Sequence, residues 1–272
     1  MNESRVRKIE SIQQHILRMF PLNNSRRYKG KDVLGMHRFI SQILVSEVTG
    51  VRNEGSGGID PKAFGTLVHD QVAAWTAWTP TPRAPTLRDF TAQCMPQVRQ
   101  LISFFQEKRY VGIGANIVVA DPLLNYATPV DILMVPIDIP KGDTEFAYLV
   151  ELKTTHTLQR KRARPCLYPI SQYLECETPE TFASLQAVLP CIRMNEIITG
   201  DVTCQNANLK LRIVPLVVVV RMDSHQSITN IEEFVVPLGM QTVAFRNQLN
   251  ERLPQLRIET SSKLYSNKKF KK

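Results

Sequence analysis

Three ionisable residues lie in apolar, strand-like runs near the middle of this 272-residue sequence. Asp131 lies in the run 128–135, and Glu151 and Lys153 lie two positions apart in the run 146–153. Side chains two positions apart on a strand point to the same face of a sheet, so Glu151 and Lys153 are expected to share a face. Charged groups in such apolar strands are costly to bury unless they pair or bind a metal ion, which marks these residues as a candidate site.

These residue types suit the hydrolysis of a phosphodiester bond. The carboxylates of Asp131 and Glu151 are hard oxygen ligands for Mg²⁺ or Mn²⁺, ions that usually keep several waters and accept phosphate oxygens as further ligands. Such an ion makes water more acidic and thereby able to attack phosphorus. Lys153 can supply positive charge for the phosphate oxygens or accept a proton.

The elements that must position these residues are short strands. Runs rich in β-branched and aromatic residues predict strands at 116–120, 128–135 and 146–153. The spacers 123–126 and 140–144 are short enough for hairpin turns, so the three strands are expected to be antiparallel neighbours. One hairpin then brings Asp131 next to Glu151 and Lys153.

Helices and further strands surround these three strands. Thr178 is the expected N-cap of one helix, with Pro179 in its first turn, and Pro190 is expected to kink that helix or end it early. Apolar spacing predicts helices at 3–20, 33–51, 61–78, 87–108, 178–198 and 242–253, and further strands at 209–221 and near 234–237. We divide the chain into a helical extension (1–60), a catalytic domain (61–258) and a basic, disordered tail (259–272).

Pro129-Val-Asp131 and Glu151-Leu-Lys153 resemble the defining motif of the PD-(D/E)XK nuclease superfamily, with one residue inserted between Pro and Asp. Helix, three antiparallel strands, helix and strand is also the core order of that superfamily, here over 65–221. The resemblance implies an α/β fold with a restriction-endonuclease-like core, in which helices flank a mixed central sheet, preceded here by an N-terminal helical extension. It implies phosphodiester cleavage in DNA or RNA.

A second element resembles the RecB-like and lambda-exonuclease-like branch. Gly65-Thr-Leu-Val-His69 looks like the Gly-x-x-x-His element of these nucleases, which implies that His69 completes a metal site with Asp131, Glu151 and Leu152. A lone histidine on an apolar helix is more often structural, so this role depends on the downstream residues. Asp70, its neighbour, points elsewhere on the helix and is expected to act only as a cap or indirectly.

Relatives also carry a glutamine in the helix after the Glu-x-Lys strand. Gln186 is the best positional match for this catalytic residue, and Gln172 is its rival. Asp121 could join the site only if the end of its strand faces it. His156, just past Lys153, is either a DNA contact or a solvated loop residue.

The charge of the chain favours a polyanionic partner. With 34 Lys and Arg against 25 Asp and Glu, the formal net charge is +9, and phosphates are the natural counterpart. DNA is the first candidate and RNA the alternative. Trp78 and Tyr168 could stack on unpaired bases, whereas Trp75 suits a core position. The basic loop after Lys153 offers four expected nucleic-acid contacts: Arg160, Lys161, Arg162 and Arg164.

The remaining composition excludes several classes of protein. Five cysteines without a C-x-x-C pair favour neither a disulfide framework nor an iron–sulfur cluster, so we expect a reducing compartment, the cytoplasm or nucleus. The longest apolar run, 213–220, contains Pro215 and is far too short to cross a bilayer, so no membrane partner is expected. The oligomeric state has no signature in the sequence.

The sequence therefore carries a leading hypothesis and two alternatives. The first is an Mg²⁺- or Mn²⁺-dependent deoxyribonuclease of RecB-like character, an exonuclease or end-processing enzyme in replication, repair or recombination. The second is a nucleic-acid-binding or assembly protein that retains the nuclease fold without catalysis. The third is a chance ion-pair network in an unrelated α/β protein, which predicts that His69, Asp131, Glu151 and Lys153 do not cluster in space.

Overall fold

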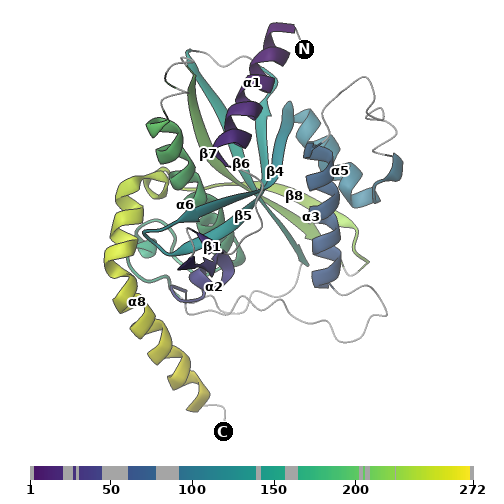
Figure 1. The fold of residues 1–272 in the computed structure, drawn as a ribbon. Coiled ribbons are helices and arrows are strands. Elements are labelled where there is room, and N and C mark those ends of the chain that lie inside the picture. Colours follow the sequence, from purple (N-terminus) through teal and green to yellow (C-terminus); the bar gives the residue numbers. More distant parts are fainter. Residues whose placement is uncertain are drawn as a thin grey trace.

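The structure is a computed structural model that describes residues 3–20, 27–28, 31–44, 61–77, 92–138, 142–156, 165–201, 205, 209–223 and 225–269. One mixed six-stranded sheet lies at the centre and helices cover both of its faces (Figure 1), which confirms the expected α/β class. In chain order the main elements are α1 (Glu3–Met19), β1 (Arg27–Tyr28), β2 (Lys31–Asp32), β3 (Leu34–Gly35), α2 (Met36–Ile40), α3 (Pro61–Ala77), α5 (Pro96–Glu107), β4 (Tyr110–Asp121), β5 (Tyr126–Pro136), β6 (Thr144–His156), η1 (Ile170–Gln172), α6 (Pro179–Gly200), β7 (Lys210–Met222), β8 (Ile228–Val235), η2 (Leu238–Gln241) and α8 (Val243–Lys269).

The sheet is organised around β5. β4 pairs antiparallel along one whole edge of β5, so the other edge is shared by β3 and β6. β3 runs parallel to β5 and pairs with residues 126–127, while β6 runs antiparallel and pairs with residues 132–134. β7 lies parallel to β6, and β8 lies antiparallel to β7. The three antiparallel neighbours and the fourth strand expected from the sequence are confirmed.

Two hydrophobic cores lie on opposite faces of the sheet. α3 and α5 cover one face, and α1, α2, α6 and α8 cover the other (Figure 1). β7 is buried on both faces: Val217 and Val219 belong to one core, and Val218 and Val220 to the other. A strand covered on both sides reads as a continuous apolar run, which explains the apolar run at 213–220.

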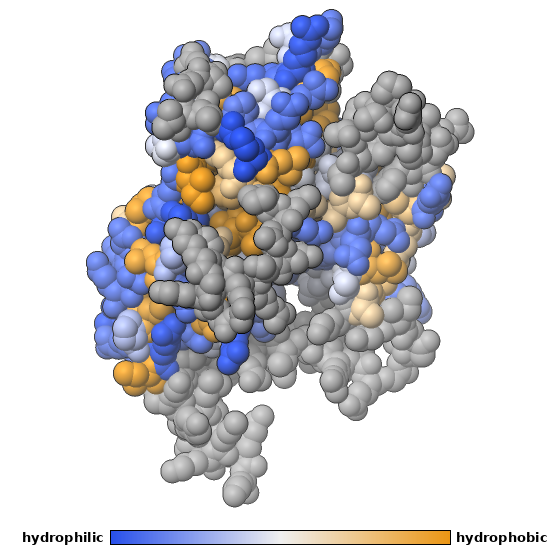
Figure 2. Space-filling model, in the orientation of Figure 1, coloured by the Kyte–Doolittle hydropathy of each residue, from blue (hydrophilic) through white to orange (hydrophobic). Residues whose placement is uncertain are grey.

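The N-terminal helix α1 is amphipathic and belongs to the same core as the sheet. Its apolar side buries Ile9, Ile12 and Ile16, and its outward side is mainly hydrophilic (Figure 2). Arg5 donates to Glu145 Oε2 and to the carbonyl of Pro136, both at 2.7 Å, and so fixes α1 to the ends of β5 and β6. The division into extension and catalytic domain stays a prediction.

Helix α6 begins as the sequence predicted. The Thr178 hydroxyl accepts a hydrogen bond from the Thr181 amide at 3.2 Å, and Pro179 occupies the first helical position. Pro190, expected to kink the helix or end it early, does not end it, because α6 continues to Gly200. Because proline lacks an amide hydrogen, Pro190 cannot donate to the carbonyl of Gln186, and the helix loses one hydrogen bond there. Its buried apolar side chains keep the segment helical.

Four element boundaries differ from the sequence prediction. The helix expected at 33–51 is the short strand β3 followed by the five-residue α2 within the described part of this segment, because residues 34–35 extend the sheet instead. The helix expected at 87–108 has α5 as its main part, which begins at Pro96, and the strand expected near 234–237 lies at 228–235. Helix α8 continues to Lys269 where a disordered tail was expected from residue 259.

Within the described residues, no helix is long and apolar enough to cross a membrane.

Candidate active site

The candidate site lies where β5 and β6 separate. The two strands pair only over residues 132–134 of β5 and 148–150 of β6, so Asp131 and Glu151 are the first residues past their last paired rung. The amide of Leu152 donates to Asp131 Oδ2 at 3.1 Å, so a side chain accepts the hydrogen bond that a β5 carbonyl could otherwise take. A carboxylate is thereby fixed at the point of divergence.

Glu151 and Lys153 share a face of β6, as the spacing predicted. Lys153 Nζ lies 2.6 Å from Glu151 Oε1, and the side chains are 29% and 6% exposed, respectively. Lys153 Nζ also lies 6.0 Å from the centre of the Phe182 ring on α6, within range of a cation–π contact. The Glu151 carboxylate is therefore buried, while the Lys153 side chain is partly exposed.

Helix α3 brings His69 to the same place from the other face of the sheet. His69 Nδ1 lies 3.5 Å from Asp131 Oδ2. The four residues predicted to cluster, His69, Asp131, Glu151 and Lys153, are thus linked in space by contacts or neighbouring strand positions. The chance-network hypothesis predicted the opposite.

The charges of these groups are strongly coupled. Burial, and next the charge of Asp131, raises the pKa of Glu151 to about 7, although Lys153 opposes this shift. Burial alone would raise the pKa of Asp131, but contact with His69 and the charge of Lys153 lower it overall. Burial alone would lower the pKa of Lys153, but Glu151 and Asp131 raise it, so Lys153 stays an ammonium group at neutral pH. Lys153 can supply positive charge and donate hydrogen bonds.

His69 is held in a mixed environment. Burial disfavours its charged form, but the contact with Asp131 and the charge of that carboxylate outweigh burial and raise the pKa of His69. The protonated form of His69 is therefore favoured beside the ionised Asp131, and a cation that binds the imidazole would have to displace its proton.

The donor set fits a hard divalent cation. The buried Glu151 and the partly exposed Asp131 lie close enough for the charge of Asp131 to raise the pKa of Glu151, a repulsion that Mg²⁺ or Mn²⁺ would relieve. Leu152 has one possible ligand atom, its backbone carbonyl oxygen, and His69 has a ring nitrogen. Among the described residues no three His, Cys, Asp or Glu side chains form a ready-made metal cluster, and Lys153 holds the Glu151 carboxylate.

Gly65 fixes the distance between α3 and β6. A Cβ atom at this position would lie 2.9 Å from Thr154 Oγ1, closer than such atoms normally approach. Gly65→Ala gains about 1 kcal/mol of helix propensity, but overpacking costs about 1–3 kcal/mol and should push α3 and His69 away from Asp131. We expect the pKa of His69 to fall toward its usual value in an NMR titration, and the double variant Gly65→Ala/Thr154→Ala to restore it. An unchanged His69 titration in Gly65→Ala would contradict this role of Gly65.

The structure separates the two glutamine candidates. Gln186 lies on α6 one turn after Phe182, the residue beside Lys153, and its buried Oε1 has no hydrogen-bond partner among the described residues. Gln172 is exposed at the end of η1, beside a tyrosine that contacts Phe245 of α8. The geometry therefore favours Gln186, whose role stays a prediction.

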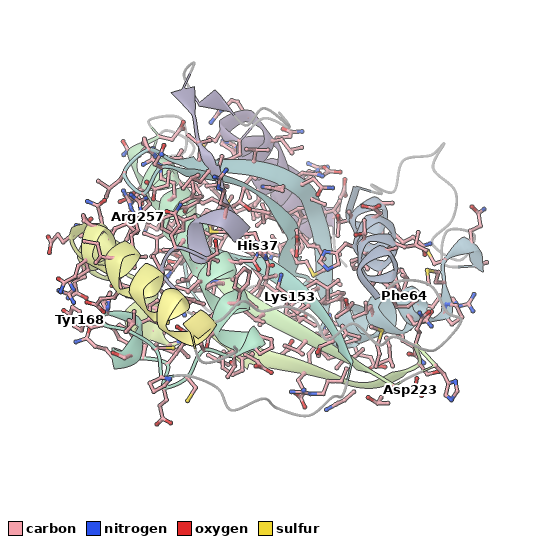
Figure 3. All side chains as sticks on the ribbon, turned by 90° about the horizontal axis from the view of Figure 1, so that it is seen from below. His37, Phe64, Lys153, Tyr168, Asp223 and Arg257 are labelled. Carbon is pink, nitrogen blue, oxygen red and sulfur yellow. The ribbon has the colours of Figure 1, made fainter. Side chains whose placement is uncertain are left out.

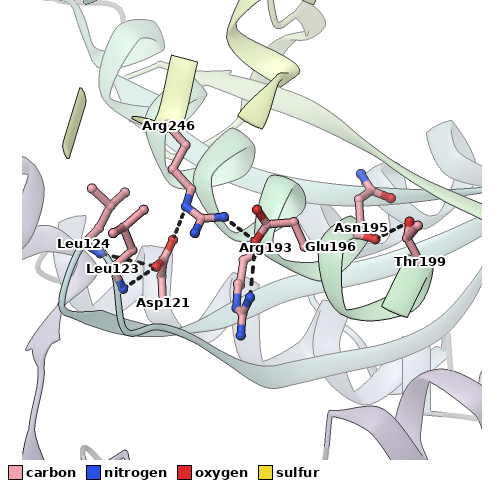
Figure 4. Close-up of polar contacts among 8 residues, drawn as sticks. All are labelled: Asp121, Leu123, Leu124, Arg193, Asn195, Glu196, Thr199 and Arg246. Carbon is pink, nitrogen blue, oxygen red and sulfur yellow. Dashed lines mark hydrogen bonds and ion pairs between the residues drawn. The ribbon is translucent and has the colours of Figure 1, made fainter. Parts of the chain in front are cut away.

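Asp121 does not face the site. It is fully buried, its Oδ1 accepts from the amides of Leu123 and Leu124, and its Oδ2 lies 3.0 Å from Arg246 Nε (Figure 4). Asp121 could join the candidate site only if its strand end faced that site, which it does not. Its role is therefore structural. Arg246 belongs to α8, so this ion pair joins that helix to the β4–β5 turn.

The other candidate residues lie apart from the cluster or outside the described part. Asp70 is exposed, and Trp75 is buried and stacked on Phe105 with ring centres 6.0 Å apart, as expected for a core residue. Tyr168 is 41% exposed and lies 5.7 Å from the Arg252 guanidinium. Outside the described residues lie Trp78, Arg160, Lys161, Arg162, Arg164 and the side chain of His156.

Two residues near the site were not singled out from the sequence. Phe182 lies under Lys153, and the ring of His37 on α2 lies 5.1 Å from that of Phe182. Phe182 occupies an ordinary apolar position of its helix, and His37 lies in a segment predicted to be a long helix. Their positions follow from strand order, which local periodicity does not contain.

Comparison with protein-family models, with curated proteins and with solved structures found no match for this chain.

Proposed function

We propose that this protein is a metal-dependent nuclease with a PD-(D/E)XK-type core that hydrolyses phosphodiester bonds in DNA. The observation that carries the proposal is the meeting of Asp131, Glu151 and Lys153 where β5 and β6 diverge, with His69 of α3 contacting Asp131. The core order of α3, three antiparallel strands, α6 and β7 supports the same conclusion.

The residues divide into two roles. Asp131, Glu151, the Leu152 carbonyl and His69 would hold Mg²⁺ or Mn²⁺, since they offer oxygen ligands from three residues and one nitrogen once Lys153 releases the Glu151 carboxylate. When bound, such an ion neutralises charge on the phosphate and makes water more acidic. The tether from Leu152 to Asp131 keeps this carboxylate oriented before any substrate arrives.

Lys153 would act directly on the substrate. Its pKa is raised by Glu151 and Asp131 against the effect of burial, so the ammonium group is charged when the phosphate arrives. Its side chain is 29% exposed, which lets Nζ reach a phosphate oxygen on which negative charge increases during the reaction. Gln186, whose buried Oε1 has no hydrogen-bond partner among the described residues, would accept a hydrogen bond from a water.

The proposal is tested by cleavage of end-labelled single- and double-stranded DNA with Mg²⁺, Mn²⁺ or EDTA. Wild-type protein should cut only with metal, and Glu151→Ala and Lys153→Ala should lose the activity. Lys210→Ala is the matched control for Lys153, because it changes an exposed lysine on the neighbouring strand at the far end of the sheet. DNA binding without cutting in any metal would instead support the non-catalytic alternative.

Metal binding should strengthen as the pH rises through about 7. The pKa of Glu151 is raised to about 7 by burial and by Asp131, and that of His69 is also raised, so at lower pH a cation must displace protons from both. Each such group lowers the apparent affinity about tenfold per pH unit below its pKa. Calorimetric titration of Mn²⁺ should show proton release and this rise in affinity, which levels off above the two pKa values.

The same shift predicts how the metal-free protein responds to pH. The folded-state pKa of Glu151 lies above its ordinary value of 4.5, so the stability contributed by its neutral form is present below 4.5 and is lost as the pH rises through about 7. Glu151→Gln should remove this loss and flatten the pH dependence of the melting temperature. A metal affinity that is independent of pH in the wild type would contradict ligand duty for Glu151.

A further inference from the structure

The N-terminal part of the chain reaches the candidate site through β3 and α2. β3 and β6 occupy the same edge of β5, at residues 126–127 and 132–134, and no other described strand pairs with that edge between them. Asp131 lies in this interval, and α2 begins directly after β3. The interval is therefore bordered by α2 as well as by β6.

A chain of side-chain contacts joins α2 to Lys153. The His37 ring lies 5.1 Å from the ring of Phe182, and Phe182 lies 6.0 Å from Lys153 Nζ. Phe182 is buried at 7% exposure, whereas His37 is exposed. In Figure 3, His37 and Lys153 are neighbours near the centre of the view. An exposed imidazole is thus held against the same phenyl ring that the Lys153 ammonium group approaches.

The basic surface continues away from the site to α8. Arg38 follows His37 and is exposed, and α2 contains no acidic residue. Gln42, in the turn after α2, accepts a hydrogen bond at 3.0 Å from Nε of Arg257, an exposed residue of α8. His37 lies between Lys153 and Arg257 in Figure 3. His37, Arg38 and Arg257 are therefore exposed donors on α2 and α8, which the Arg257–Gln42 hydrogen bond joins.

We propose that α2 and α8 form a phosphate-binding track for the nucleic-acid strand next to the cleavage centre. His37 and Arg38 contact the phosphate adjacent to the scissile one, and Arg257 contacts the same strand further out. Imidazole and guanidinium donors suit phosphate oxygens, and such contacts fix the register of the strand without reading its sequence. The track rests on the proposed nuclease function and identifies where its substrate runs.

The track is tested first by binding, which requires no cleavage. Fluorescent single- and double-stranded oligonucleotides are titrated without divalent metal against His37→Ala, Arg38→Ala, Arg257→Gln and the wild type. Each variant should bind about three- to tenfold more weakly, and in Arg38→Ala and Arg257→Gln the slope of log affinity against log salt should decrease by about 0.7–0.9 for the phosphate that the variant no longer neutralises. Arg257→Lys should keep the wild-type slope. Arg7→Ala is the control, an equally exposed arginine on α1.

Cleavage kinetics then separate this proposal from the proposed function. With metal, the three variants should raise KM about three- to tenfold and leave kcat within about twofold, because they remove contacts made equally in the ground and transition states. Metal-dependent cleavage with wild-type KM and salt slope in all three variants would overturn the track and leave the nuclease standing. Loss of binding in the variants of a protein that never cuts would sustain the track and overturn the nuclease. A wild type that binds neither oligonucleotide overturns the track.

Discussion

Asp131→Asn is expected to reduce DNA cleavage by at least about a hundred- to thousandfold while the protein keeps its fold. The substitution removes one negative charge from the centre where Glu151 and His69 meet. An asparagine carbonyl oxygen can still accept the Leu152 amide, which now donates to Asp131 Oδ2 at 3.1 Å, so the divergence of β5 and β6 is preserved. Single-turnover cleavage at saturating metal, together with a thermal melt, measures both quantities.

The structure offers a matched control for this variant. Asp138 lies two residues beyond the end of β5, is exposed and pairs with Arg109, whereas Asp131 lies in the middle of that strand. Asp138→Asn removes the same charge from the same segment and should cleave like the wild type. Equal activity of Asp131→Asn and the wild type would exclude Asp131 from the chemistry.

The melting temperature of Asp131→Asn is also expected to depend on pH differently from that of the wild type. The pKa of Asp131 is lowered because His69 and Lys153 favour its charged form over the effect of burial. A lowered pKa means that the carboxylate stabilises the fold above its ordinary pKa of 3.8 and loses this contribution as the pH falls. Asp131→Asn should therefore melt below the wild type at neutral pH, and the two should converge in acid. Asp131→Asn is thus expected to lose its activity while it remains folded.

The residues of the candidate site could be found from the sequence because the information is local. The alternation in 128–135 and 146–153 fixes which side chains share a face, and a short spacer between strands forces a hairpin. Asp131, Glu151 and Lys153 follow from these two facts alone. His69 was found through its spacing from Gly65, and its contact with Asp131 depends on that glycine because α3 must approach Thr154 closely.

The surroundings of the site could not be found in the same way. Residues 34–35 belong to a segment whose apolar spacing predicts a helix, but they pair with residues 126–127, about ninety positions away, because an open edge of β5 is available. The position of His37 beside Phe182 can be predicted only once the pairing of residues 34–35 with residues 126–127 is known. In α6 two local signals conflict: apolar spacing predicts a helix over 178–198, whereas Pro190 predicts a kink or an early end. The helix continues because Leu189 and Cys191 are buried, which outweighs one missing hydrogen bond.

Asp121→Ala is expected to destabilise the protein by about 3–5 kcal/mol, since it leaves a buried arginine without one of its two partners. Arg246 is nearly buried and lies 3.0 Å from Asp121 Oδ2, and it also pairs with Glu196 of α6 (Figure 4). The same carboxylate accepts from the amides of Leu123 and Leu124. Chemical denaturation at neutral pH, followed by circular dichroism, gives the free energy of unfolding.

Two further variants separate the charge from the turn. Asp121→Asn keeps an acceptor for the Leu123 and Leu124 amides and removes only the charge, so it should fall between the wild type and Asp121→Ala. The apolar pair Asp121→Leu/Arg246→Met should recover part of the loss, because a buried ion pair is often replaceable by apolar side chains of similar volume. Asp138→Ala, which breaks an exposed pair with Arg109, should change stability far less. A wild-type free energy of unfolding in Asp121→Ala would mean that this ion pair does not hold α8, and with it Arg257, against the sheet.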